Sequence, residues 1–93
     1  MNSKFCSLLG FARKSGNLII GYDNIEKKIS KSKLLISACD IAERTSKNIE
    51  KLGLPLIKTD LEKSELGRII GCKDVSVVAV IDENFSESLK NNQ

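Results

Sequence analysis

The chain has 93 residues, 41% hydrophobic and 29% charged, a balance typical of one globular domain and not of a disordered chain. No apolar run approaches the roughly 20 residues that span a bilayer, and the start lacks the order of a signal peptide, so we expect a cytoplasmic protein. The net charge of +3 is uneven: residues 1–33 hold seven basic and two acidic side chains, which favours an anionic partner such as nucleic acid.

The first third of the chain predicts a helix, a short strand and a second helix. Apolar residues recur at helical spacing over residues 5–12, with Ser3 as the N-cap and Gly16 at the end. Residues 18–20 form a short apolar run, which predicts a strand. A second helical stripe follows over residues 22–29, with lysines on its opposite face.

The middle of the chain predicts a buried strand and a third helix. Residues 34–39 are almost continuously apolar, as in a strand that is covered on both faces. Asp40 follows, with Glu43 three residues later, which predicts a capping box. The helical stripe behind it ends at Gly53.

The last third predicts two more strands and two more helices. Residues 56–58 form a strand, and Thr59 or Asp60 caps a helix that ends at Gly71. Residues 75–81 are the strongest strand of the chain, and Asp82 begins the last helix.

The predicted elements alternate strictly, α-β-α-β-α-β-α-β-α, over residues 1–93 without a linker. Strict alternation with short connections indicates a single α/β domain whose sheet is covered by helices on both faces.

Catalytic and metal-dependent functions find little support in the sequence. The chain has no histidine, which removes the commonest general base, and no Cys-x-x-Cys pair, so we expect no enzyme, metal or cofactor. We expect Cys6, Cys39 and Cys72 to be reduced and mostly buried. Cys39, at a strand end before a helix, is the best candidate for a reactive thiol, although Asp40 beside it disfavours a thiolate.

The junction over residues 21–28 is a candidate RNA-binding site. Gly21 lets the backbone approach a partner closely, and Asp23 and Asn24 can hydrogen-bond to base edges at the helix start. Lys27 and Lys31 follow at one-turn intervals on the same face, where they would neutralise phosphates. The alternative is an ordinary N-cap above a solvated lysine face.

Four segments in order give the chain a resemblance to a known family. They are residues 21–27, residues 33–40, the Glu-Leu-Gly-Arg run over residues 65–68 and the Val-Val-Ala-Val run over residues 77–80. Together they resemble the kink-turn-binding ribosomal protein superfamily, which includes the large-subunit ribosomal proteins seven-Ae and thirty-e. The resemblance is nearest to the small bacterial YlxQ-like members and covers residues 8–85.

The resemblance implies a three-layer α/β/α sandwich on a mixed four-stranded sheet. It also implies non-catalytic binding of structured RNA, either a kink-turn or ribosomal RNA, with no membrane and no small-molecule substrate. The RNA-binding positions it implies are Gly21, Tyr22, Asp23, Asn24, Lys27, Lys28, Lys31, Lys63, Val75 and Ser76.

The chain departs from the family pattern at the junction. Asp23 stands where the family has a neutral or basic residue, and Asn24 replaces a longer Glu or Gln. Tyr22 is bulkier than the usual Thr or Ser and could stack on a base. These changes favour a second hypothesis, a protein-interaction module of the same fold that has lost high-affinity kink-turn binding.

Overall fold

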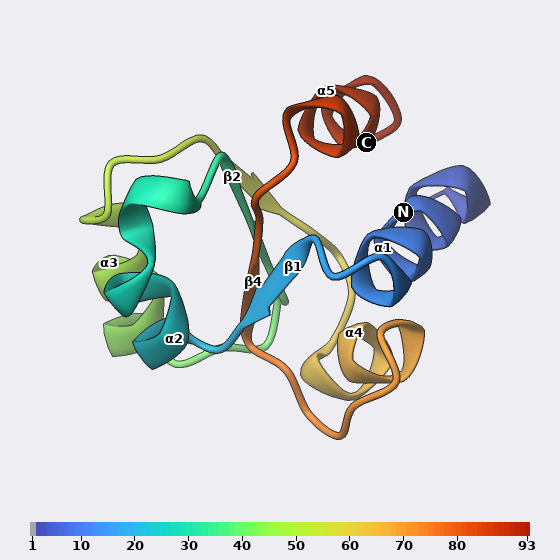
Figure 1. The fold of residues 1–93 in the computed structure, drawn as a ribbon. Coiled ribbons are helices and arrows are strands. Elements are labelled where there is room, and N and C mark those ends of the chain that lie inside the picture. The colour runs from blue at the N-terminus through green and yellow to red at the C-terminus, as the bar shows by residue number, and fades with distance from the viewer. Residues whose placement is uncertain (1) are drawn as a thin grey trace.

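The computed structural model describes residues 2–93, in which helices lie on both sides of one four-stranded sheet (Figure 1). The elements in chain order are α1 (Ser3–Lys14), β1 (Leu18–Ile20), α2 (Tyr22–Lys27), a 3-10 helix η1 (Ile29–Lys31), β2 (Leu34–Ser37), α3 (Glu43–Glu50), β3 (Leu56–Lys58), α4 (Lys63–Ile69), β4 (Val77–Val80) and α5 (Glu83–Asn91).

The sheet is mixed and has the strand order β1-β4-β2-β3. β4 pairs antiparallel with both β1 and β2, whereas β2 and β3 are parallel. β1, β2 and β3 therefore run in one direction and β4 in the other. As a consequence, the carboxyl ends of the first three strands and the start of β4 share one edge of the sheet.

Two apolar clusters fill the space between the sheet and its two helix layers. One face is covered by α1, α4 and α5, which bury residues such as Phe5, Leu66 and Leu89 against it, and the other by α2 and α3 (Figure 1). Leu34 and Leu35 point to opposite clusters, as successive strand residues must. All residues of β2 and β4 are buried, which confirms the predicted α/β sandwich.

Side-chain caps explain where the first and last helices begin. The cap of α1 is Asn2, whose Oδ1 accepts a hydrogen bond from Phe5 N at 2.8 Å, so the prediction of Ser3 was wrong by one residue. Asp82 caps α5 as predicted, because its Oδ2 accepts from Phe85 N at 2.9 Å.

The predicted capping box at Asp40 and Glu43 is wrong. α3 begins only at Glu43, after Ala42 as N-cap, and Asp40 Oδ1 instead accepts a hydrogen bond from Lys63 N at 2.7 Å. The physical reason lies in tertiary contacts: Cys39 N donates to Leu61 O at 2.8 Å and holds this segment beside the start of α4.

Thr59 and Asp60 do not cap α4 either, because its N-cap is Glu62. Glu62 N donates to Glu65 Oε1 at 3.0 Å. The buried Thr59 hydroxyl donates to Ser37 O at 2.8 Å and so links the ends of β2 and β3.

The second and fourth strands are shorter than predicted, and the second helix is interrupted. β2 ends at Ser37 and β4 begins at Val77. α2 stops at Lys27, and Lys28 has a φ of −118° before η1 begins. Every helix within residues 2–93 is too short or too polar to cross a bilayer.

Candidate nucleic-acid interface

Backbone hydrogen bonds bring three of the predicted segments together at the sheet edge where β1 ends and β4 begins. Gly21 N donates to Val77 O at 3.1 Å, which places the β1–α2 junction directly beside the start of β4. Val75 N donates to Lys63 O at 3.1 Å and ties the preceding loop to the first turn of α4. Residues 21–24, 63 and 75–76 therefore meet, although residue 24 precedes residue 63 by 39 positions and residue 75 by 51.

Gly21 has the backbone conformation that the junction requires. Its φ is +90°, a value that L side chains rarely adopt, and no atom lies near the position a Cβ would take. Gly21 O accepts the first helical hydrogen bond of α2, from Ile25 N at 3.1 Å. The glycine thus turns the chain sharply from strand to helix and leaves open space above the turn.

Two of the polar side chains at the junction have partners within the protein. The Tyr22 ring packs against the cluster beneath α2, and its hydroxyl donates to Glu26 Oε2 at 3.3 Å. Partial desolvation and then the charge of Glu26 raise the pKa of Tyr22. Asn24 Nδ2 donates to Ile20 O at 2.9 Å, which ties Asn24 to the end of β1. Asp23 is exposed at the helix start.

Exposed lysines follow the junction, as the sequence predicts. Lys27, Lys28 and Lys31 are all exposed, and Lys63 is half-buried. The ion pairs described within residues 2–93 involve Lys47, Lys58 and Lys90, and none involves these four. Their charges are therefore available to an external anion.

The single helix expected to carry both Lys27 and Lys31 is interrupted between them. Lys28 N donates to both Asn24 O and Ile25 O, at 3.2 and 3.1 Å, and this tightening ends α2. Lys31 then lies in η1, where its N–H donates to Lys28 O at 3.0 Å. Lys27 and Lys31 thus lie on two successive short helices.

The loop before β4 exposes fewer of its predicted RNA-binding side chains than the sequence suggests. Val75 is only 4% exposed and belongs to the core cluster beneath α4, so its side chain does not face solvent. Ser76 is half-buried, and its carbonyl accepts from Ala38 N at 2.9 Å. Lys73 and Asp74 are the exposed residues of this loop.

Lys73 and Asp40 are site residues that the sequence reasoning did not select. Lys73 adds an exposed cation to the loop that leads to Ser76, and Asp40 holds the first turn of α4 at the edge. No local pattern distinguishes either residue. Only the pairing of β4 with β1 and β2 shows that the loop before β4 and the segment after β2 reach the sheet edge at which Gly21 lies.

A hollow of about 420 Å³ lies at the same edge, at the ends of β2 and β3. Its lining includes Cys39, Ile41 and Ser46. Cys39 is exposed, and Cys6 and Cys72 are half-buried, so the expectation of mostly buried thiols was wrong. The cause at Cys39 is that β2 ends two residues earlier than predicted. Within residues 2–93, no group of acidic or cysteine side chains is arranged to hold a metal ion.

Several solved structures resemble this chain, and one of them matches nearly its whole length. A solved structure, described as that of a protein with unknown function from Bacillus halodurans C, has a TM-score of 0.85 to this chain. The two sequences are 27% identical over 97% of this chain and 96% of the other. No protein-family model and no curated protein matches this sequence.

Proposed function

We propose that this chain is a non-catalytic RNA-binding protein that contacts structured RNA through the sheet edge around Gly21. The observation that carries the proposal is the meeting of residues 21–24, Lys63 and Ser76, with Lys27, Lys28 and Lys31 exposed and unpaired within residues 2–93. Such a site combines polar groups that can read bases with cations that can neutralise phosphates.

The RNA class follows from the resemblance of the sequence to kink-turn-binding ribosomal proteins, and we propose a kink-turn or ribosomal RNA as the partner. The open space above Gly21 would admit the close approach of a bent RNA backbone. Three free cysteines support a reducing compartment, the cytoplasm.

The test is a titration of the full chain with a kink-turn RNA and with a plain duplex of equal length, at 50 and 200 mM salt. If about three phosphates are neutralised, affinity should fall about 40-fold between these concentrations. Tighter, salt-sensitive binding to the kink-turn would support the proposal.

A pair of matched variants tests the interface itself. Lys27→Ala/Lys31→Ala should weaken kink-turn binding at least about tenfold and make the salt dependence shallower, because two exposed cations are lost. Lys47→Ala/Lys90→Ala removes the same charge from two lysines that form ion pairs within the chain, and it should bind almost as the parent does. Equal losses in the two variants would refute the assignment and leave only a general effect of net charge.

The second candidate is a protein-interaction module of the same fold. The exposed carboxylate of Asp23 favours it, because that charge lies where a phosphate would approach. Equal and weak binding to both RNAs in the titration would support this candidate over the first.

A further inference from the structure

Phe11 is the one large hydrophobic side chain that is exposed within residues 2–93. It lies on α1, and 60% of its surface is accessible. A single exposed aromatic residue is common on protein surfaces and carries no argument alone. The surroundings of Phe11 are what make it informative.

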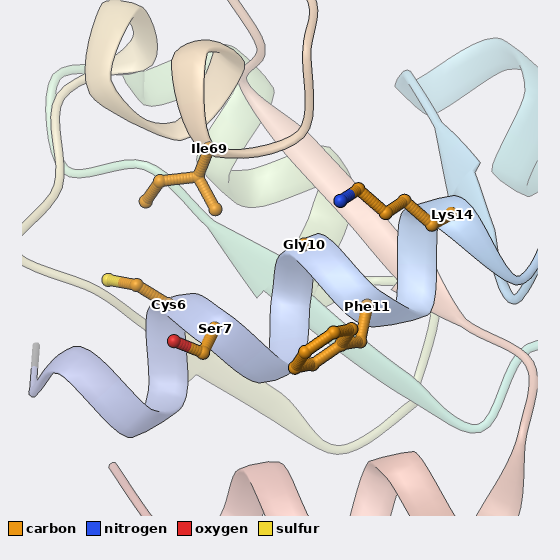
Figure 2. A pocket seen from close by; sticks show the side chains of 6 residues that line it. All are labelled: Cys6, Ser7, Gly10, Phe11, Lys14 and Ile69. Atoms are coloured by element: carbon orange, nitrogen blue, oxygen red, sulfur yellow. The ribbon is translucent and has the colours of Figure 1, made fainter.

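A hollow lies beside Phe11, between α1 and α4. Its volume is about 370 Å³, and the residues that line it are Cys6, Ser7, Gly10, Phe11, Lys14 and Ile69 (Figure 2). Cys6, Gly10 and Ile69 form a mostly apolar floor, and Phe11 lies at its rim (Figure 2). The hollow is large enough for an apolar side chain from another molecule.

Neither backbone conformation nor packing requires a glycine at position 10. It lies inside α1 with an ordinary helical backbone, unlike the glycines whose φ is positive. A Cβ at this position would come no closer than 3.6 Å to Ile69 O, which is ordinary contact, so alanine would fit. Glycine weakens a helix interior relative to alanine. Its visible consequence is that no side chain rises from the floor of the hollow at position 10.

The charged side chains on α1 indicate which charge a partner bound at the hollow should carry. α1 carries Lys4, Arg13 and Lys14 and no acidic residue, and none of the three forms an ion pair within residues 2–93. Figure 2 shows Lys14, the one charged residue that lines the hollow, at one end of it. A second copy of α1 would bring like charges together, so the charge pattern favours an acidic partner.

We propose that this hollow is a docking site for a short amphipathic segment of an acidic partner protein. One leucine or phenylalanine side chain of the segment inserts over Gly10, between Phe11 and Ile69, and its carboxylates lie beside Arg13 and Lys14. The mostly apolar lining favours a protein side chain over RNA, which would need polar groups to contact its bases. This inference does not depend on the proposed RNA function.

The experiment is an amide-resolved NMR titration of the full chain with three synthetic 12-residue peptides. The first consists of glutamates and alanines with one central leucine, the second replaces that leucine with serine, and the third replaces the glutamates with lysines. The first should saturate with shifts at Cys6, Gly10 and Ile69, and the other two should bind at least about tenfold more weakly, a difference of 1.4 kcal/mol.

Three variants locate the contact, and a fourth serves as control. Gly10→Leu should fill the hollow, and Phe11→Ser should remove its rim. Each variant should weaken binding of the first peptide at least about tenfold, while its circular dichroism spectrum remains that of the folded protein. Lys14→Gln should weaken binding more than Lys90→Gln, which changes the same charge on α5.

Three results would overturn the proposal. One is the absence of saturable shifts at these amides with the first peptide. Another is tighter binding of an eight-nucleotide single-stranded RNA at the same amides. The last is a protein dimer in sedimentation that Phe11→Ser converts to monomer, since this would assign the hollow to a second copy of the chain.

Discussion

Two glycines inside helices should respond oppositely to the same substitution, and this contrast tests the packing of the loop before β4. Gly10 lies in α1 and Gly67 in α4. Alanine is more favourable than glycine in a helix interior by about 0.8–1.0 kcal/mol. Local propensity therefore predicts the same gain at both positions, and any difference comes from tertiary contacts.

The surroundings of the two glycines differ sharply. A Cβ at Gly10 would lie 3.6 Å from its nearest neighbour, whereas a Cβ at Gly67 would lie 1.4 Å from Lys73 O. The loop would have to retreat by about 2 Å to reach ordinary contact. That movement would also break the hydrogen bond from Cys72 N to Gly67 O, which is 2.7 Å long.

The magnitudes follow from these distances. Gly10→Ala should raise the free energy of unfolding by close to 1 kcal/mol. At Gly67, overpacking costs about 1–3 kcal/mol and the lost hydrogen bond about 1 kcal/mol, which outweighs the helix gain and leaves a net loss of about 2 kcal/mol. The two variants should thus differ by about 3 kcal/mol, or more than 10 °C in melting temperature.

Urea denaturation of the parent and both variants, followed by circular dichroism, measures the difference directly. The slopes of the transitions should agree, so that the midpoints report stability alone. If Gly67→Ala is as stable as the parent, the loop before β4 does not pack on α4 as described. The position assigned to Ser76 in that loop would then also be wrong. If Gly10→Ala is destabilising, the hollow beside it is not open, and the argument from Gly10 fails.

Three further perturbations follow from single contacts. Gly21→Ala should cost about 1–2 kcal/mol in urea denaturation because its φ is +90°, and it should also weaken kink-turn binding; an unchanged stability would contradict the assigned conformation. Asp82→Ala should cost about 1 kcal/mol by removing the bond to Phe85 N, whereas Asp82→Asn should restore most of it. The hydrogen bond and charge of Lys58 lower the pKa of Glu50, so this pair stabilises the fold above the ordinary glutamate pKa and stops doing so as the pH falls through the lower folded value. Glu50→Gln should therefore lower stability at pH 7 and make little difference at pH 2, and a difference that persisted in acid would exclude the ion pair as its cause.

The sequence by itself determined the elements and most of the core. Helix and strand periods are local properties of the chain, and Gly16, Gly53 and Gly71, which end three helical segments, all have positive φ values in the structure. The apolar runs of β2 and β4 require cover on both faces, and this requirement alone indicates a sheet between two helix layers. The end of β1 at Gly21 and the exposure of Lys27 and Lys31 could likewise be predicted from neighbouring residues.

Only the tertiary structure decided which hydrogen-bond partners the polar groups of those elements have and which loop side chains are buried. Asp40 has the spacing of a helix cap for α3, yet it accepts a hydrogen bond from Lys63 N, 23 residues away, because β2 ends early and directs it to α4. The family resemblance places Val75 among the loop residues that contact RNA, yet its side chain is buried beneath α4. The order β1-β4-β2-β3 places Gly21 beside Val77, and no local pattern contains that information. Spacing along the chain reports which side chains must be buried, whereas the partner of a hydrogen-bonding group depends on which strands pair.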